Sequence, residues 1–322
     1  AEQALEDWQP EWQEPAIGHM LGRCYLSAMI GEGATCLVYR ALHLSLKIDV
    51  AVKVFKPQVD DGPIAALSAK EALLLARLNH PSVLRVLDYD NQDRYPHMVM
   101  EYVDSMTMQE MIQQDGRLSA HRVLRIASAA AEGLAYAHSQ GIIHCDIKPG
   151  NLLIGKDGRV KIADLGVAKV TGQSLGLGSD GEQTHIVGTP AYMPPEQAQY
   201  GLQAVDDRSD IYALGATMFH ALAGEPPFVH EDPMQMLVSH IQEAPRHLID
   251  VLPGITPEMA DIVDCCLAKD PRDRFQSLDE LIDALRQVPE SETTRIKRRN
   301  EHQRGLVYRT VSFLKRALTG EG

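Results

Sequence analysis

The run His144-Cys145-Asp146-Ile147-Lys148-Pro149-Gly150-Asn151 is the most informative part of this sequence about fold and chemistry. Within it, Asp146 offers a carboxylate that can accept or orient the proton of a hydroxyl group. Lys148 can neutralise a transferring phosphoryl group, and Asn151 offers a side-chain oxygen for a metal ion. These side chains, gathered in one short run, indicate a phosphoryl-transfer site.

A second oxygen ligand follows in the run Asp164-Leu165-Gly166. Magnesium binds few protein carboxylates and takes its remaining ligands from phosphates and water. Asn151, Asp164 and a bound nucleotide together satisfy that requirement.

Two features nearer the N-terminus complete the pattern. Gly31 and Gly33 lie between two strand-like runs, where the absence of Cβ lets the backbone approach phosphate oxygens, although a hairpin turn explains them equally well. Lys53 ends the apolar run Ala51-Val52-Lys53 on the next expected strand, and a buried lysine there requires a partner. We expect this partner to be Glu71; a lysine and a glutamate that both lie on the surface are the alternative.

Three motifs in this order resemble those of the eukaryotic-type (Hanks-type) protein kinase family. They are H-x-D-x-K-x-x-N, D-x-G and Gly188-Thr189-Pro190-Ala191-Tyr192-Met193-Pro194-Pro195-Glu196. The resemblance runs from about Tyr25 to Val288, and it is strongest to bacterial serine/threonine protein kinases. It implies transfer of the γ-phosphate of ATP to serine and threonine hydroxyls of proteins, in bacterial signalling, with autophosphorylation.

The same resemblance implies an α+β fold, the bilobal protein kinase fold. We expect a small antiparallel β N-lobe with one helix over about 25–102 and a larger helical C-lobe over about 103–288. Residues 1–24 are an N-terminal extension, and residues 289–322 are a basic amphipathic C-terminal extension. Apolar periodicity predicts strands near 30–41, 49–55, 83–89 and 97–103, and helices near 63–79, 119–140, 206–223, 232–243, 257–268 and 278–287.

The family's roles carry over to the matching positions. The resemblance implies a catalytic set of Asp146 as the base, Lys148, Lys53 and Glu71. It implies Asn151 and Asp164 as ligands for Mg²⁺, with Mn²⁺ as an alternative ion. The implied ATP-binding residues are Ile30, Gly31, Gly33, Val38, Ala51, Lys53, Met100, Glu101, Val103 and Leu153. Two structural roles also carry over: Asp210 holds the catalytic-loop backbone, and Glu196 pairs with Arg274.

Two other classes of function compete with a protein kinase. A scaffold without catalysis would have lost Lys53, Asp146, Asn151 or Asp164, and all four are present. A small-molecule phosphotransferase would share Asp146 and Asn151, but it would lack Lys148 and the segment from Gly188 to Glu196 that builds a peptide platform. That segment favours a protein substrate, and Lys148 with Thr189 favours serine and threonine.

The chain departs from the family pattern at three positions. Cys145 replaces the arginine that usually precedes the catalytic aspartate and orders a phosphorylated activation loop. We therefore expect activity that does not depend on phosphorylation at Thr171, Ser174, Ser179 or Thr184. Leu165 replaces a phenylalanine and Cys36 a third glycine, and neither change is expected to abolish activity.

Composition excludes several other classes. The net charge of −13 argues against nucleic-acid binding. Five irregularly spaced cysteines indicate free thiols in a reducing cytosol, so we expect a cytoplasmic protein, and no apolar run reaches the length of a membrane span. Protein substrates are the expected partners, with a cognate phosphatase and phosphothreonine-binding proteins as further candidates. The oligomeric state is not predicted.

The two ends lie outside the kinase pattern. Residues 295–318 combine a basic run with apolar residues at helical spacing. Docking on a kinase domain is the preferred interpretation; contact with an anionic membrane and a linker to a further domain are the alternatives. Trp8 and Trp12 are expected to cover apolar surface.

Overall fold

A computed structural model describes residues 13–33, 35–56, 75–91, 95–165, 169–170 and 189–289. Trp8, Trp12, Glu71, Gly166, Gly188, the four candidate phosphorylation sites and residues 295–318 lie outside these ranges, so the predictions made for them are not addressed. The described chain divides into two compact units, one up to Asp104 and one from Ser105.

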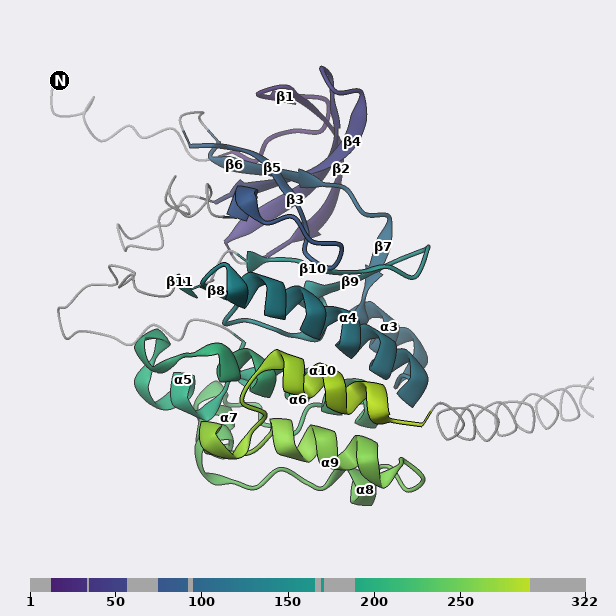
Figure 1. Cartoon of the computed structure of the whole chain (residues 1–322). Helices are drawn as coiled ribbons and strands as arrows, with labels where there is room; N and C mark the ends of the chain where they lie inside the picture. Colours follow the sequence, from purple (N-terminus) through teal and green to yellow (C-terminus); the bar gives the residue numbers. More distant parts are fainter. Residues whose placement is uncertain are drawn as a thin grey trace, which may run out of the picture. The chain divides into compact units, whose positions relative to one another are not determined.

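The first unit is built on a six-stranded antiparallel sheet with the strand order β1-β2-β3-β4-β6-β5 (Figure 1). The strands are β1 (Met20–Leu21), β2 (Cys24–Glu32), β3 (Cys36–His43), β4 (Ile48–Phe55), β5 (Val86–Asp90) and β6 (His97–Glu101). Alternate residues of β3 and β4, such as Leu37, Tyr39 and Val52, are buried in one apolar cluster. These alternate side chains point to one face of the sheet and form its core there. The residues between them point to the opposite face.

The predicted run over 30–41 proves to be parts of two strands. Gly33 N–H donates to Cys36 O at 2.8 Å and closes the turn between β2 and β3. Of the helix predicted over 63–79, only residues 75–79 are described: the chain is helical at 75–77 and not at 78–79.

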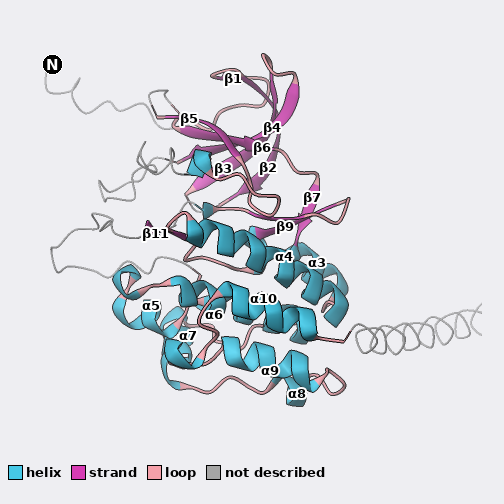
Figure 2. Ribbon diagram, viewed as in Figure 1, coloured by secondary structure: helices cyan, strands magenta, loops and turns pink. Residues whose placement is uncertain are grey.

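The second unit is mainly helical (Figure 2). Its helices are α3 (Met108–Asp115), α4 (Ala120–Ser139), α5 (Pro195–Tyr200), α6 (Asp207–Ala223), α7 (Pro233–Gln242), α8 (Leu248–Val251), α9 (Pro257–Cys266) and α10 (Leu278–Gln287). Helix α4 confirms the helix predicted near 119–140, and Ser119 caps it by accepting a hydrogen bond from Arg122 N–H.

Helix α6 is the centre of the second unit. Every residue from Ser209 to Leu222 is buried, and the helix packs against α4 and α9. A helix surrounded on all sides buries its whole circumference. Asp206 caps its first turn, and Gly224 ends it in a left-handed conformation with a φ of 92°.

Two small sheets accompany the helices. The strands β7 (Ser105–Thr107), β9 (Leu152–Gly155) and β10 (Val160–Ile162) form one, and β8 (Ile142–Ile143) pairs with β11 (Lys169–Val170) in the other. The α+β prediction is confirmed by an antiparallel sheet in the first unit and a helical second unit. None of the helices in the described ranges is both long and apolar enough to cross a membrane.

Candidate active site

Residues 144–151 form a loop between β8 and β9 that contains one 3-10 turn, Pro149–Asn151. Hydrogen bonds surround the Asp146 carboxylate in this loop. Its Oδ1 accepts from Thr189 N–H at 3.0 Å, and its Oδ2 accepts from Lys148 Nζ at 2.7 Å and Asn151 Nδ2 at 3.3 Å. These donors fix the orientation of the carboxylate, whose side chain is only 10% exposed.

Lys148 connects the Asp146 carboxylate to Thr189. Its Nζ donates to Thr189 Oγ1 at 2.6 Å as well as to Asp146. The side chain is 28% exposed, so its cation remains within reach of solvent and of a charged ligand. Thr189 therefore contacts Asp146 directly through its backbone and indirectly through Lys148.

The two candidate metal ligands lie on adjoining segments. Asn151 donates through Nδ2 to Asp146 O at 2.8 Å, so its side-chain oxygen is not used in that bond. Asn151 O accepts from Ala163 N–H at 2.8 Å, which places the residue before Asp164 beside Asn151. Asp164 has a φ of 67°, in the left-handed region that aspartate tolerates better than most residues. An amide oxygen and one carboxylate on adjoining segments fit a magnesium ion that takes its remaining ligands from phosphates and water.

Asp210 holds the backbone of the catalytic loop, as predicted. It is fully buried, and its carboxylate accepts from His144 N–H at 2.9 Å and Cys145 N–H at 3.0 Å. Cys145 has a φ of 65°, an unfavourable conformation for a residue with a side chain. The two hydrogen bonds from one carboxylate stabilise this conformation and fix the position of the next residue, Asp146.

The Cys145 side chain packs inside the second unit. It is 5% exposed and lies in an apolar cluster with Ile143 and Val205, against which Leu202 packs. Its Sγ lies 3.6 Å from Ile143 O. The residue that replaces an arginine thus belongs to the core.

Five candidate nucleotide residues of the first unit, Gly31, Val38, Ala51, Lys53 and Met100, share one face of its sheet. Gly31, Val38, Lys53 and Met98 lie opposite one another across β2, β3, β4 and β6. Directly opposite residues point to the same face of an antiparallel sheet, as do alternate residues of one strand. Ala51 and Met100, which are also opposite each other and two residues from Lys53 and Met98, therefore face the same way.

Gly31 and Gly33 are not explained by the fold alone. Neither has a positive φ. A Cβ at Gly31 would lie 3.7 Å from Val38 Cβ, and one at Gly33 would lie 3.4 Å from Cys36 Sγ. Neither backbone conformation nor packing therefore demands glycine at Gly31, and at Gly33 only the end of one side chain would have to adjust. Room beside a bare backbone is what a phosphate group requires.

The other candidate nucleotide residues are distributed over the two units. Ile30 is exposed on β2, and Glu101 ends β6 with its N–H donating to Arg85 O at 3.0 Å. Val103 follows β6 in the same unit. In the second unit, Leu153 on β9 alternates with Leu152, which is buried in the core.

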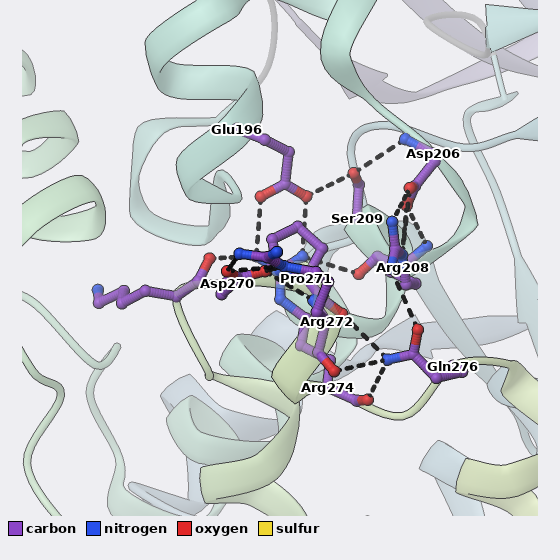
Figure 3. Close-up of polar contacts among 10 residues, drawn as sticks. Glu196, Asp206, Arg208, Ser209, Asp270, Pro271, Arg272, Arg274 and Gln276 are labelled. Carbon is purple, nitrogen blue, oxygen red and sulfur yellow. Dashed lines mark hydrogen bonds and ion pairs between the residues drawn. The ribbon is translucent and has the colours of Figure 1, made fainter.

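The predicted pair Glu196 and Arg274 is confirmed and is part of a larger network (Figure 3). Ser209 Oγ donates to Glu196 Oε1 at 2.6 Å, and Arg274 also donates to Arg208 O at 3.0 Å. The Arg274 guanidinium lies 4.8 Å from the centre of the Tyr212 ring. These contacts join α5, α6 and the segment before α10.

Sequence reasoning missed His138. It lies in the last turn of α4, and its Nε2 donates to Asp210 Oδ2 at 2.8 Å. The two residues are 72 positions apart, and no local pattern marks a histidine at a helix end as a partner of a distant aspartate.

Comparison with known proteins identifies the class to which this fold and site belong. The model of the family described as "Protein kinase domain" matches residues 25–285. The chain belongs to this family.

Three curated relatives of this chain come from bacteria. The chain is 35% identical over 285 residues to serine/threonine-protein kinase PknB of Mycolicibacterium smegmatis, covering 85% of this chain and 44% of that protein. It is 37% identical over 266 residues to a probable serine/threonine-protein kinase of Streptomyces coelicolor, covering 81% and 39%. A probable serine/threonine-protein kinase of Clostridium perfringens is 32% identical over 298 residues, covering 92% and 43%. The chain thus spans less than half the length of these relatives.

Proposed function

We propose that this chain is a serine/threonine protein kinase that transfers the γ-phosphate of ATP to hydroxyl groups of proteins. One observation carries the proposal: the Asp146 carboxylate is held by Lys148, Asn151 and the backbone of Thr189. A carboxylate, a cation and an amide side chain meet there, as transfer of a charged phosphoryl group to a hydroxyl requires. Membership of the family and the names of the relatives support the same activity.

Asp146 is the proposed base. Its carboxylate would orient the attacking hydroxyl and take its proton, while Lys148 offsets negative charge on the phosphates. Asn151 and Asp164 would hold the divalent ion, Mg²⁺ with Mn²⁺ as the alternative. This ion, when bound with ATP, neutralises charge on the phosphates.

Lys53 would hold the α- and β-phosphates and pair with Glu71. Gly31 and Gly33 would lie over the phosphates, and the shared face of Gly31, Val38, Ala51, Lys53 and Met100 supports these assignments. The adenine would contact Ile30, Val38, Ala51, Met100, Leu153 and the backbone at Glu101 and Val103.

Thr189 supports serine and threonine as the acceptor class. Its hydroxyl accepts from Lys148, which also contacts the proposed base, so the acceptor segment and the catalytic loop are coupled. The competing function is that of a small-molecule phosphotransferase, which would not require this coupling.

We also propose that activity does not require a phosphorylated activation loop. Cys145 carries no charge that could bind a phosphate. Its burial beside Ile143 and Val205 supports a catalytic loop that is held in place by packing and by its hydrogen bonds to Asp210. Autophosphorylation in bacterial signalling would then accompany activity without controlling it. If simultaneous replacement of Thr171, Ser174, Ser179 and Thr184 by alanine abolished turnover of an added substrate, this part of the proposal would be wrong.

The remaining assignments follow from the proposed activity. The kinase domain would cover about residues 25–288, with an N-terminal extension over 1–24 and a basic C-terminal extension over 289–322. Protein substrates are the proposed partners, with a cognate phosphatase and phosphothreonine-binding proteins as further candidates, in a cytoplasmic setting. Residues 295–318 would dock on a kinase domain.

The direct test offers labelled Mg-ATP with either a basic protein acceptor or small aminoglycoside and choline acceptors. We expect label on the protein acceptor and on neither small molecule. We also expect Lys53→Met to lower turnover by orders of magnitude, because a phosphate contact is lost. Label on a small acceptor alone would favour the rival function.

A further inference from the structure

Lys56 contacts the turn between β2 and β3 at two points. Its Nζ lies 2.8 Å from Glu32 Oε1, which makes an ion pair. Its backbone N–H donates to Thr35 O at 2.9 Å. Glu32 is the last residue of β2 and Thr35 directly precedes β3, so the two contacts lie on either side of Gly33. The turn is therefore attached to the residue that follows β4.

The attachment point at the end of β4 is itself held by the sheet. Phe55, the last residue of β4, donates through its N–H to Pro96 O at 2.9 Å, and the centre of its ring lies 6.5 Å from that of Tyr89. The Lys56 side chain is 22% exposed, whereas that of Glu32 is 56% exposed. Lys56 is thus the anchored partner of the ion pair, and the turn is the part that it holds.

The strand that ends at this anchor also carries Lys53. Lys53 lies opposite Val38, which lies opposite Gly31. The turn that contains Gly33 and the strand that contains Lys53 are two parts of the proposed phosphate site, and both belong to the first unit. A contact between them sets their separation, and a ligand binds more tightly to groups that are already in place.

The ion pair acts from the face of the sheet that does not hold the proposed nucleotide residues. Glu32 lies opposite Leu37, whose side chain is buried in the core of the first unit. Adjacent residues of a strand point to opposite faces, so Glu32 points away from the face that Gly31 and Val38 share. The pair can therefore place the turn without contacting a phosphate itself.

We propose that Lys56 is a positioning residue for ATP binding: its ion pair with Glu32 fixes the turn between β2 and β3 relative to Lys53. Neither Lys56 nor Glu32 touches the nucleotide in this scheme. The inference rests on the proposed kinase activity, because that activity assigns the turn to the phosphates of ATP.

Charge reversal separates positioning from a simple attraction between the protein and ATP. Lys56→Glu and Glu32→Lys each leave two like charges at the pair, so each should release the turn. The double variant restores opposite charges and should restore ATP binding. If charge acted directly on the phosphates, Glu32→Lys would instead bind ATP more tightly than the wild type.

Lys47→Glu is the matched control for the change in net charge. Lys47 is exposed and directly precedes β4, whereas Lys56 directly follows it. The two lysines are therefore separated by the whole strand, about 25 Å of extended chain. Lys47→Glu changes the charge of the first unit as Lys56→Glu does, but it leaves the turn between β2 and β3 attached.

The experiment measures the Kd of the full chain for Mg-ATP and for adenosine by isothermal titration calorimetry. Low salt is used because it screens exposed charges least. We expect each single reversal at the pair to raise the Kd for Mg-ATP about threefold to fivefold, on the order of one exposed ion pair. The double variant and Lys47→Glu should lie within about twofold of wild type, and so should every Kd for adenosine, which has no phosphates.

Tighter binding of Mg-ATP by Glu32→Lys, or a double variant as impaired as the single variants, would overturn the proposal. Equal weakening of Mg-ATP and adenosine would also overturn it, because the substitutions would then disturb the whole first unit. A wild type that binds Mg-ATP but labels no protein acceptor would contradict the proposed kinase activity and leave the comparison of Kd values intact. The two failures are thereby distinguished.

Discussion

Arg274 meets Glu196 in a two-pronged ion pair in which Nη1 and Nη2 each lie 2.8 Å from a carboxylate oxygen. The Arg274 side chain is fully buried and that of Glu196 is 11% exposed. We predict that Arg274→Met lowers the free energy of unfolding by about 3–5 kcal/mol, because it leaves a buried carboxylate without its charged partner. Denaturant unfolding measures the change.

The control for this prediction is two residues away. Arg272 pairs with Asp270, but its side chain is 82% exposed. An exposed pair contributes about 0–1 kcal/mol, so Arg272→Met should have little effect on stability. Equal losses from the two substitutions would contradict the distinction between the buried and the exposed pair.

Thr189 offers a test of the link between the acceptor segment and the catalytic loop. Thr189→Val keeps the shape but removes the hydroxyl that accepts from Lys148 at 2.6 Å. We expect it to lower kcat about tenfold, because Lys148 loses a neighbour that orients it beside Asp146. Thr189→Ser keeps the hydroxyl and should restore most of the activity. A serine variant as impaired as the valine variant would show that the hydroxyl is not the important group.

Gly215 marks the closest approach of two helices. A Cβ at this position in α6 would collide with Cβ of Cys266 in α9. We predict that Gly215→Ala lowers the free energy of unfolding by about 1–3 kcal/mol or more, because the helices must move apart. Gly150 has nothing within 4 Å of an added Cβ, so Gly150→Ala should be close to neutral in the same unfolding measurement. A neutral Gly215→Ala would mean that the two helices separate without cost.

His240 should make stability depend on pH. Burial, aided by the charge of Lys269, lowers its pKa from 6.5 to about 3, and its Nδ1 lies 2.8 Å from the Tyr212 hydroxyl. Below pH 6.5, His240 is protonated in the unfolded chain but stays neutral in the folded chain. The contribution of neutral His240 to the free energy of unfolding is therefore lost as pH falls from 6.5 towards 3.

The expected slope is about 1.4 kcal/mol per pH unit below the unfolded pKa. His240→Gln removes the titrating group. The free energy of unfolding of this variant should therefore fall less steeply between pH 7 and pH 5 than that of the wild type. Parallel curves for the two proteins would show that His240 is not held neutral by the fold.

Local signals in the sequence account for much of the fold. Ser119 marks the start of α4 because a side-chain cap needs only its own turn. Short elements gave no such signal: α3, α5 and the β7-β9-β10 sheet span too few residues for a clear period, and the sequence did not reveal them.

The site divides in the same way. Asp146 and Lys148 are two residues apart, so a short sequence motif can predict their contact at 2.7 Å. The pairing of His138 with Asp210 depends on how α4 packs against α6, and tertiary packing leaves no local pattern. Lys53 and Glu71 remain a prediction, because Glu71 lies outside the described residues.

The most direct test of the proposed function is transfer of labelled γ-phosphate from Mg-ATP to a basic protein by wild type and by Asp146→Asn, with the modified residues mapped by mass spectrometry. The substitution keeps the size of the side chain but removes the carboxylate that would take the hydroxyl proton. We predict label on serine and threonine with the wild type, turnover lower by orders of magnitude with the variant, and an unchanged unfolding temperature. Near-native turnover by Asp146→Asn would contradict the assignment of Asp146 as the base.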